Sequence, residues 1–573
     1  MTKKSLSWVT LCIVIFFLFL PNLLTAFIIT DATAITPQHY HVLLAIAAEV
    51  ILFACVGRGD IFLLLQLPFF IWLPIELVYI IRYGSPTSAH ILNIISETNL
   101  DEVLGYVGGY DILILYIFYI LAVAVSLIFL WGKNIAWRHR SRWWAFISIA
   151  GLFLINGVFD DKLNREMAKS RAVFSEVDEF VAPQFVLGLD EYKNTYPMGL
   201  VLRVVEFYQQ QKILKETAAS LANIESKLIR EKSIRQEVYV VVIGESSRAD
   251  HWMLNGYARA TTPLLSTRTD IVNYSNAVSV AATTRTAVPV LLSRSSVSDI
   301  IQSNLKSSWV SEFKQKGFKT YWLSTQMPVG THDTLIGAYA DLANKVQYFN
   351  LGRYSIHSDF DEVLLPALKS ALDSNEEKKL IVLHTLGSHA PYHFRYPSSF
   401  SVFSPVPDDH LIVDIFDHKI NDQVINAYDN SVRYTDFVVN EAIELIKKKN
   451  LYSALWYISD HGETFSSENC ASVGHGFGSK NNFHVPLIFW ASTSFAEANP
   501  SIINGAKSQK DKPVYSADFF DTLMMTAGFE NRSRAFNAFV KESYTVPKRM
   551  VATSGAAAID YDLEYANNAC GKK

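Results

Sequence analysis

Side chains that could bind a metal follow three apolar, strand-like runs of this sequence. Glu245 comes directly after VYVVVIG, Asp460 and His461 follow ALWYIS, and His389 lies just beyond KLIVLHT. Carboxylate oxygens and imidazole nitrogens bind Zn²⁺, and a catalytic zinc keeps one open position beside three protein ligands. A lone acid after a strand is more often a helix N-terminal residue. The coincidence of three such strands is what favours a metal site.

The segment YSNAVSVAATTRTAVPVLLSR offers candidate nucleophiles in Thr283, Thr284 and Thr286. A threonine hydroxyl attacks at neutral pH only when a base or a metal lowers its pKa. Thr284 could instead open a helix. The two roles are compatible, because a helix N-terminus also favours a bound phosphoryl group. Two further histidines lie later in the sequence. His475 in GHGFG is a candidate for binding a second metal or a substrate phosphate, and His393 in PYHF is expected at the surface.

These residues need a sheet that brings their strands to one edge. After residue 236, apolar runs at 238–243, 318–323, 379–385 and 454–459 alternate with helical stretches. This alternation predicts a soluble α/β domain with a mostly parallel sheet covered on both faces. In such sheets the functional groups gather beyond the carboxyl ends of the strands.

The first 159 residues have the pattern of a membrane α-helical domain. Hydrophobic residues make up 50% of the 573-residue chain and charged residues only 18%. Apolar runs of roughly membrane-spanning length predict five spans, at 8–30, 41–57, 61–81, 112–131 and 143–159. The basic residues between them predict a cytoplasmic N-terminus and an outside location for everything after the fifth span. A cleavable signal peptide is the alternative for the first run.

The remaining chain is expected to form a linker with bridging helices at 160–235, including an amphipathic helical stretch over 198–233, a catalytic domain at 236–560 and a tail at 561–573. A net charge of −4 without a basic stripe argues against a nucleic-acid partner. Cys470 and Cys570 are the only cysteines outside the apolar runs. Whether they pair is left open by the sequence.

Several motifs together resemble the phosphoethanolamine transferases of the alkaline phosphatase/sulfatase superfamily, which modify bacterial lipopolysaccharide. They are GESSRADHWMLNGY, the Thr-rich segment before Val288-Pro289, HTLGSHAPY, NAYDNSVRYTD, and SDHGE followed by GHG. The resemblance extends to the five-span amino-terminal domain and to a loop signature, here SETNLDEV at 96–103, and so covers nearly the whole chain.

The resemblance implies roles for individual residues of this sequence. It makes Glu245, Asp460 and His461, together with Thr284, the zinc ligands, and Thr284 the nucleophile. It places His389 and His475 near the substrate phosphate or a second zinc, and it associates Thr98 and Glu102 with the lipid donor. One departure is that many relatives, including the polymyxin-resistance enzymes, place cysteines around the nucleophile segment, where this chain has Val280 and Val290.

The function implied is that of a multi-pass inner-membrane enzyme of bacteria with a periplasmic catalytic domain. It would move phosphoethanolamine from phosphatidylethanolamine to lipopolysaccharide, on lipid A or a core sugar, through a zinc-activated threonine and a phosphothreonine intermediate. Transfer of phosphoglycerol by a similar enzyme is one alternative, and a catalytically inactive membrane sensor is another. A sulfatase activity is disfavoured, because the Cys/Ser-x-Pro-x-Arg sequence that yields formylglycine is absent.

Overall fold

The chain divides into two compact units, Met1–Gln209 and Gln210–Lys573. The computed structural model describes residues 13, 15–25, 37–83, 86–87, 92, 110–130, 136–149, 151, 191–231, 236–301, 304–327, 334–350, 359–407, 418–466, 470, 473–476, 478–553, 558–566 and 569–570. Thr98 and Glu102, the residues associated with the lipid donor, lie outside the described residues.

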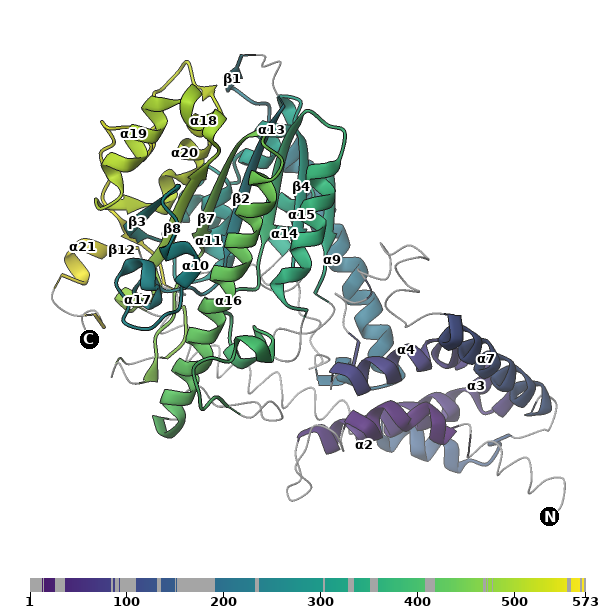
Figure 1. The fold of residues 1–573 in the computed structure, drawn as a ribbon. Helices are drawn as coiled ribbons and strands as arrows, with labels where there is room; N and C mark the ends of the chain where they lie inside the picture. The colour runs from purple at the N-terminus through teal and green to yellow at the C-terminus, as the bar shows by residue number, and fades with distance from the viewer. Residues whose placement is uncertain are drawn as a thin grey trace. The chain divides into compact units, whose positions relative to one another are not determined.

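An eight-stranded sheet forms the centre of the second unit (Figure 1). Every pairing in it is parallel except the two made by β8, which confirms the predicted mostly parallel α/β sheet. Its strands, in spatial order, are β5 (Lys345–Tyr348), β4 (Lys319–Ser324), β6 (Lys378–His384), β2 (Glu237–Gly244), β7 (Tyr452–Ser459), β8 (His484–Ala491), β3 (Ile271–Val278) and β9 (Val514–Tyr515).

The central strand β2 is buried along its whole length. Its side chains alternate between two hydrophobic cores, as the period of two in a strand requires: Tyr239, Val241 and Ile243 enter one core, and Val238, Val240 and Val242 the other. Both faces of the sheet are therefore covered, which explains why EVYVVVIG is an uninterrupted apolar run and not an alternating one.

Helices cover each face of this sheet (Figure 1). The core of the first face includes residues of α11 (Thr284–Leu292), α13 (Trp309–Gln315), α14 (Thr334–Ala340) and α20 (Phe519–Thr526); that of the second includes residues of α15 (Leu364–Asp373) and α16 (Asn421–Lys447). The other elements of this unit are α10 (Pro263–Ser266), α12 (Val297–Ile301), α17 (Lys480–Phe483), α18 (Thr493–Ala498), α19 (Pro500–Gln509), α21 (Tyr561–Glu564), β1 (Ile229–Arg230), β10 (Phe529–Glu530), β11 (Met550–Val551) and β12 (Ile559–Asp560).

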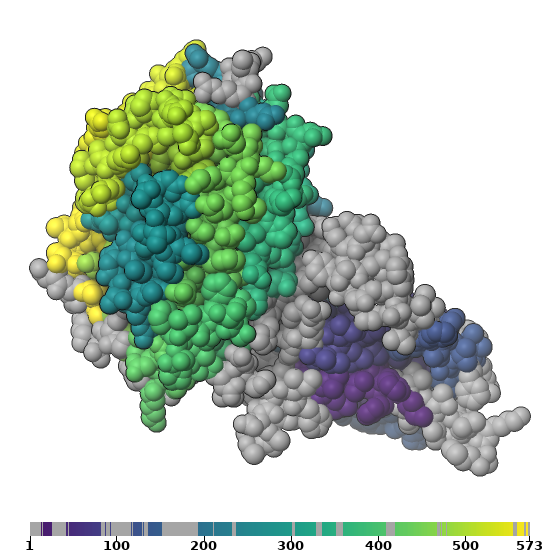
Figure 2. All heavy atoms as spheres, viewed as in Figure 1, coloured from purple at the N-terminus to yellow at the C-terminus, as the bar shows by residue number. Residues whose placement is uncertain are grey.

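Segments far apart in the sequence adjoin on the surface of the second unit. Figure 2 shows teal atoms of the region near residues 250–275 bordering yellow-green atoms from beyond residue 480 on one face. The pairing of β3 with β8, which joins Ile271 to Trp490, accounts for this contact.

The first unit contains α2 (Pro37–Val56), α3 (Gly59–Leu65), α4 (Leu67–Tyr83) and α7 (Tyr110–Leu130), with further helical residues at 15–25 and 141–149. Among the described residues, no single helix has both the length and the hydropathy needed to cross a bilayer; Gly59–Leu65 and Leu67–Ile81, bent by 48°, meet that test only as a pair. The five predicted spans therefore remain a prediction.

A buried ion pair joins α4 to α9 (Met198–Ala222) within the first unit. Arg203 Nη1 lies 2.8 Å from Glu76 Oε1, and both side chains are almost fully buried. Thr87 Oγ1 donates to Glu76 Oε2 at 2.6 Å, and Arg203 also donates to the Thr87 carbonyl oxygen. Breaking such a pair from one side leaves an uncompensated buried charge and costs about 3–5 kcal/mol.

The helical stretch predicted over 198–233 is present as α9, but the helix ends at Ala222. The chain after it forms β1, which pairs with β10.

Candidate metal centre and nucleophile

The register of the central strands brings the candidate ligands together. β2 and β7 run parallel, with Gly244 opposite Ser459, so Glu245 and Asp460 are the next residues on two neighbouring strands. The Asp460 amide donates to the Gly244 carbonyl oxygen at 3.1 Å and continues the ladder one step further. Glu245, Asp460 and His461 are all buried. Two adjacent strand ends thus supply three of the four predicted ligands.

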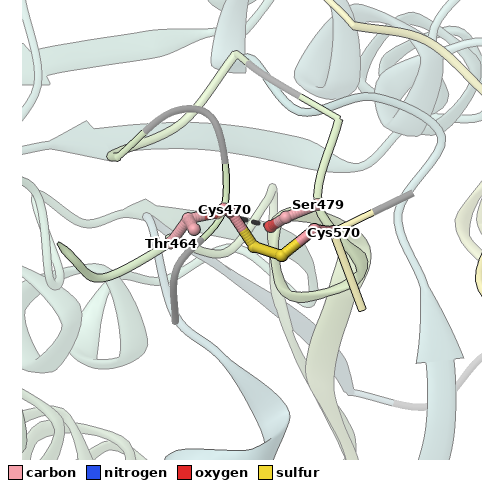
Figure 3. Close-up of a disulfide and its surroundings, with 4 residues drawn as sticks. All are labelled: Thr464, Cys470, Ser479 and Cys570. Atoms are coloured by element: carbon pink, nitrogen blue, oxygen red, sulfur yellow. Dashed lines mark hydrogen bonds between the residues drawn. A yellow bond between two sulfur atoms is a disulfide. The ribbon is translucent and has the colours of Figure 1, made fainter. Parts of the chain in front are cut away.

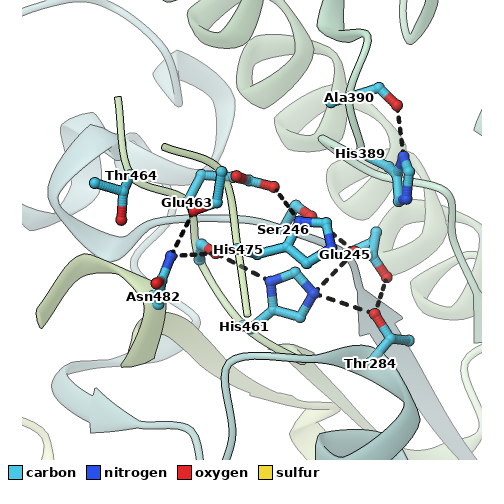
Figure 4. Close-up of polar contacts among 12 residues, drawn as sticks. Glu245, Ser246, Thr284, His389, Ala390, His461, Glu463, Thr464, His475 and Asn482 are labelled. Atoms are coloured by element: carbon cyan, nitrogen blue, oxygen red, sulfur yellow. Dashed lines mark hydrogen bonds and ion pairs between the residues drawn. The ribbon is translucent and has the colours of Figure 1, made fainter. Parts of the chain in front are cut away.

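The side chains of Glu245 and His461 converge with the Thr284 hydroxyl (Figure 4). Thr284 Oγ1 lies 3.1 Å from Glu245 Oε2 and 3.1 Å from His461 Nε2. His461 Nε2 is also 3.3 Å from Glu245 Oε1 and 3.4 Å from Asp460 Oδ2. One ligand atom from each of Glu245, Asp460 and His461 lies within 4.8 Å of the others.

The two buried carboxylates of this cluster favour a bound cation. Burial and the neighbouring Glu245 carboxylate raise the pKa of Asp460 to about 7. Burial alone would lower the pKa of His461, but the Asp460 and Glu245 carboxylates raise it to about 10. Although burial opposes its ionisation, Glu245 has a pKa well below its usual value, because it faces the His461 imidazole. Two carboxylates thus compete for one positive charge in a buried site.

The donor set fits zinc. Asp460 Oδ2 is buried and has no hydrogen-bond partner, as an oxygen reserved for a metal would be. His461 Nδ1 lies 3.0 Å from the Gly462 carbonyl oxygen. Because a carbonyl only accepts, Nδ1 carries the proton, and the lone pair of neutral His461 is then on Nε2, toward the carboxylates. A backbone carbonyl that fixes the tautomer in this way is typical of metal-binding histidines.

We expect zinc affinity to rise with pH. Zinc must displace the proton of His461 and, below about pH 7, that of Asp460 as well, because both pKa values are raised. The logarithm of the apparent association constant should gain about one unit per pH unit above pH 7, and more below it. Titrations against a competing chelator from pH 6 to 9 measure this slope, and a flat profile would contradict the competition.

Thr284 is the first residue of α11 and is half-buried. Its hydroxyl contacts Glu245 and His461, whereas the Thr283 hydroxyl is directed to Thr286 Oγ1 at 3.5 Å. Among the three candidate nucleophiles, the structure therefore brings Thr284 to Glu245 and His461. Thr284 thus opens the helix as its first residue, but the N-cap position belongs to Thr283, which makes no side-chain capping hydrogen bond.

His475 and His389 lie beside the cluster of candidate ligands. The ring centroids of His475 and His461 are 4.5 Å apart, and those of His475 and His389 are 5.9 Å apart. His389 Nδ1 lies 2.6 Å from the Ala390 carbonyl oxygen, so it donates there, and Arg395 Nε donates to the His389 carbonyl oxygen at 2.7 Å. His475 thus adjoins the candidate ligand His461, and His389 adjoins His475.

Three further polar residues support the site and were missed from the sequence. Glu463 is buried, and its Oε1 lies 2.9 Å from His475 Nδ1. Gln326 Nε2 donates to Glu245 Oε2 at 2.9 Å, and Ser246 Oγ donates to Glu245 Oε1 at 2.7 Å. Gln326 lies two residues beyond the end of β4, so the rule that favoured Glu245 could have identified it. Glu463 lies four residues beyond the end of β7, in a segment without regular structure, and gives no such signal.

Two other histidines, His384 and His393, are buried in the protein interior. His384 is the last residue of β6, with its ring 5.4 Å from that of Trp322 and its Nδ1 3.3 Å from Ser324 Oγ. The surface position expected for His393 is wrong: the residue is 6% exposed. It lies in a short 3-10 turn whose aromatic neighbours Tyr392 and Phe394 are also buried, and its ring contacts Phe394.

Gly387 holds the loop after β6 against Glu245. Its φ is +53°, and a Cβ there would lie 2.8 Å from the Glu245 carbonyl oxygen and 2.9 Å from its amide nitrogen. We expect Gly387→Ala to cost about 1–2 kcal/mol in backbone strain and, by displacing Glu245, to weaken zinc binding about tenfold.

Gly256→Ala is the matched control for Gly387→Ala. Gly256 has a φ of +97° and open space around its Cβ position. Its substitution should lower the melting temperature without changing zinc affinity measured by calorimetry. Equal zinc affinities for the two variants would refute the contact with Glu245.

Val280 and Val290, on either side of the Thr-rich segment, are buried together with Tyr561 and Tyr565. Within the described residues a disulfide joins Cys470 to Cys570, with their Cα atoms 5.1 Å apart (Figure 3).

Comparison with known proteins agrees with this geometry. The model of the family described as Sulfatase matches residues 237–529. The YhbX protein of Escherichia coli (strain K12) is 34% identical over 50% of this chain and 48% of its own length, so the chain spans about half of it. Phosphoethanolamine transferase EptC of the same organism is 26% identical over 74% of this chain and 73% of its own.

A solved structure shares the fold of the second unit. The C-terminal periplasmic domain of EcEptC from Escherichia coli, in complex with Zn, superposes with a TM-score of 0.52 at 24% identity, covering 61% of this chain and 99% of that domain. Since the family model matches more than half of the sequence, the chain belongs to the sulfatase family.

Proposed function

We propose that this protein is a phosphoethanolamine transferase that takes its group from phosphatidylethanolamine and places it on lipopolysaccharide. The observation that carries the proposal is the Thr284 hydroxyl, held 3.1 Å from both a buried carboxylate and a buried imidazole. The name of the relative EptC supports the choice of the transferred group. A threonine in place of a formylglycine precursor favours transfer over sulfate ester hydrolysis.

The residues of the chain account for two displacements. In the first, the Thr284 hydroxyl, which donates to Glu245 Oε2, loses its proton to solvent and Oγ1 attacks the donor phosphorus; the bond from phosphorus to the diacylglycerol oxygen breaks, and that oxygen takes up one proton from solvent. In the second, an acceptor hydroxyl loses its proton and its oxygen attacks the phosphothreonine; the bond from phosphorus to Thr284 Oγ1 breaks, and Oγ1 regains one proton. His389 and His475 hold the phosphoryl oxygens during both steps. Hydrolysis of the phosphothreonine is prevented if water is excluded from the position of the attacking acceptor oxygen.

Zinc held by Glu245, Asp460, His461 and Thr284 would supply a Lewis acid that favours the ionised hydroxyl. The first 159 residues would anchor the enzyme in the bacterial inner membrane through five spans, with the catalytic domain in the periplasm. Thr98 and Glu102 would contact the lipid donor. This placement gives both lipid substrates access to one site.

Two alternatives predict different results in one assay. The purified full-length protein, loaded with zinc in detergent, should release diacylglycerol from fluorescent phosphatidylethanolamine. Release from phosphatidylglycerol alone would establish a phosphoglycerol transferase. Release from neither lipid, with zinc bound, would favour the inactive sensor. Mass spectrometry of lipopolysaccharide from cells with and without the protein then identifies the acceptor.

A further inference from the structure

His475 lies in a loop that follows the candidate ligands Asp460 and His461 in sequence and contacts the backbone just before the Thr-rich segment. We define the His475 loop by its described residues 464–466, 470, 473–476 and 478–479. Gly474 and Thr464 exchange backbone hydrogen bonds at 2.8 and 2.9 Å, and the Gly476 amide donates to the Ala282 carbonyl oxygen at 2.8 Å. The side chains of Thr464 and Ser479 also bond to each other (Figure 3). These contacts set the position of the His475 backbone.

A C-terminal strap, defined by described residues 550–553, 558–566 and 569–570, contacts the nucleophile segment. Ala552 accepts from the Ala282 amide at 3.0 Å and donates to the Val280 carbonyl oxygen at 2.9 Å. Tyr561 and Tyr565 of the strap pack in the buried cluster that contains Val280 and Val290. The strap thus supports the backbone just before Thr284.

The same strap is bound to the His475 loop at its far end. The Lys480 amide, next to the loop, donates to the Ala569 carbonyl oxygen at 2.7 Å. The Cys470–Cys570 disulfide adds a covalent link between positions 100 residues apart in sequence. Together, this hydrogen bond and the disulfide hold the strap against the His475 loop, and the disulfide is the covalent part of that link.

We propose that Cys470 and Cys570 are positioning residues for His475, so that transfer is fast only while their disulfide is intact. This inference rests on the proposed function, in which His475 holds the phosphoryl group. A water-soluble phosphine reduces the bond: the phosphine takes an oxygen from water to become its oxide, and two electrons and two protons convert the disulfide to two thiols. The zinc ligands contain no sulfur, so this reaction leaves the metal site chemically intact.

The test compares oxidised and phosphine-reduced full-length protein in detergent, with fluorescent phosphatidylethanolamine. Reduction should lower kcat about tenfold, the scale expected when a catalytic group shifts by a fraction of an ångström, with KM and zinc content nearly unchanged. The double variant Cys470→Ser/Cys570→Ser should match the reduced protein and should not respond to the phosphine. Cys55→Ser, which alters the free cysteine of the described residues, should respond like the wild type.

A His475→Ala background separates positioning from general stability. If the disulfide acts through His475, reduction should produce little further loss of kcat in this variant, because the two changes are coupled. An equal loss in both backgrounds, or unchanged kcat in fully reduced wild type, would overturn the inference. If oxidised wild type releases no diacylglycerol, the proposed function fails. Hydrogen exchange still tests the restraint in that case: reduction should accelerate exchange at residues 473–476, and unchanged exchange refutes it.

Discussion

Thr284→Ala should abolish diacylglycerol release while the protein keeps its fold and its zinc. In the proposed mechanism the Thr284 hydroxyl forms the bond to phosphorus, and removal of a nucleophile lowers kcat by about 10³-fold or more. Glu245, Asp460 and His461 remain to hold the metal, and the half-buried side chain leaves little cavity. Diacylglycerol release, zinc stoichiometry and melting temperature measure the three expectations.

Thr283→Ala and Thr286→Ala are the matched controls for Thr284→Ala. Their hydroxyls face each other, so each variant should keep measurable turnover. Intact-mass spectra of wild type with donor but no acceptor should show a population heavier by one phosphoethanolamine, mapped to Thr284. The assignment is refuted by modification of Thr283 or Thr286, or by full activity of Thr284→Ala.

Glu245→Ala should remove zinc and activity together. Glu245 supplies one of two buried carboxylates facing His461, and loss of outer-shell partners alone costs 10–100-fold in metal affinity. We therefore expect a loss of about 100-fold or more, measured by competition with a chelator. Gln326→Ala, which deletes a single donor to the same carboxylate, should have a smaller effect. Unchanged zinc stoichiometry in Glu245→Ala would exclude this residue from the site.

The central strands were predictable because burial on both faces leaves a clear pattern. The runs at 238–243, 318–323, 379–385 and 454–459 correspond to β2, β4, β6 and β7 within two residues at each end. β3 and β8 were not identified. IVNYSNAV is only half-buried and carries a register shift between Tyr274 and Ala277, and HVPLIFWA contains a proline. Their antiparallel pairing depends on long-range contacts that no local pattern encodes.

The site residues that follow the ends of strands were predictable, and those positioned by loops were not. Glu245, Asp460 and His461 follow from the rule on parallel strands. Which of three adjacent threonines faces them depends on the exact start of α11, and resemblance to a family chose Thr284 where spacing could not. Glu463 follows Gly462, where the chain passes so close to Asn481 that a Cβ would lie 2.1 Å from the Asn481 carbonyl oxygen. Such close approach of two backbones is invisible in the sequence.

The order of strands in the sheet also fixes when the metal site can exist during synthesis. β2 lies between β6 and β7, both made much later, and Asp460 is added 215 residues after Glu245 (460 − 245). At typical rates of about 5–20 residues per second, that interval lasts roughly 10–40 s. Throughout it Glu245 has neither Asp460 nor His461 as a neighbour. Zinc loading therefore follows synthesis of Asp460 and His461, and a nascent chain stalled before residue 460 contains the first ligand without the site.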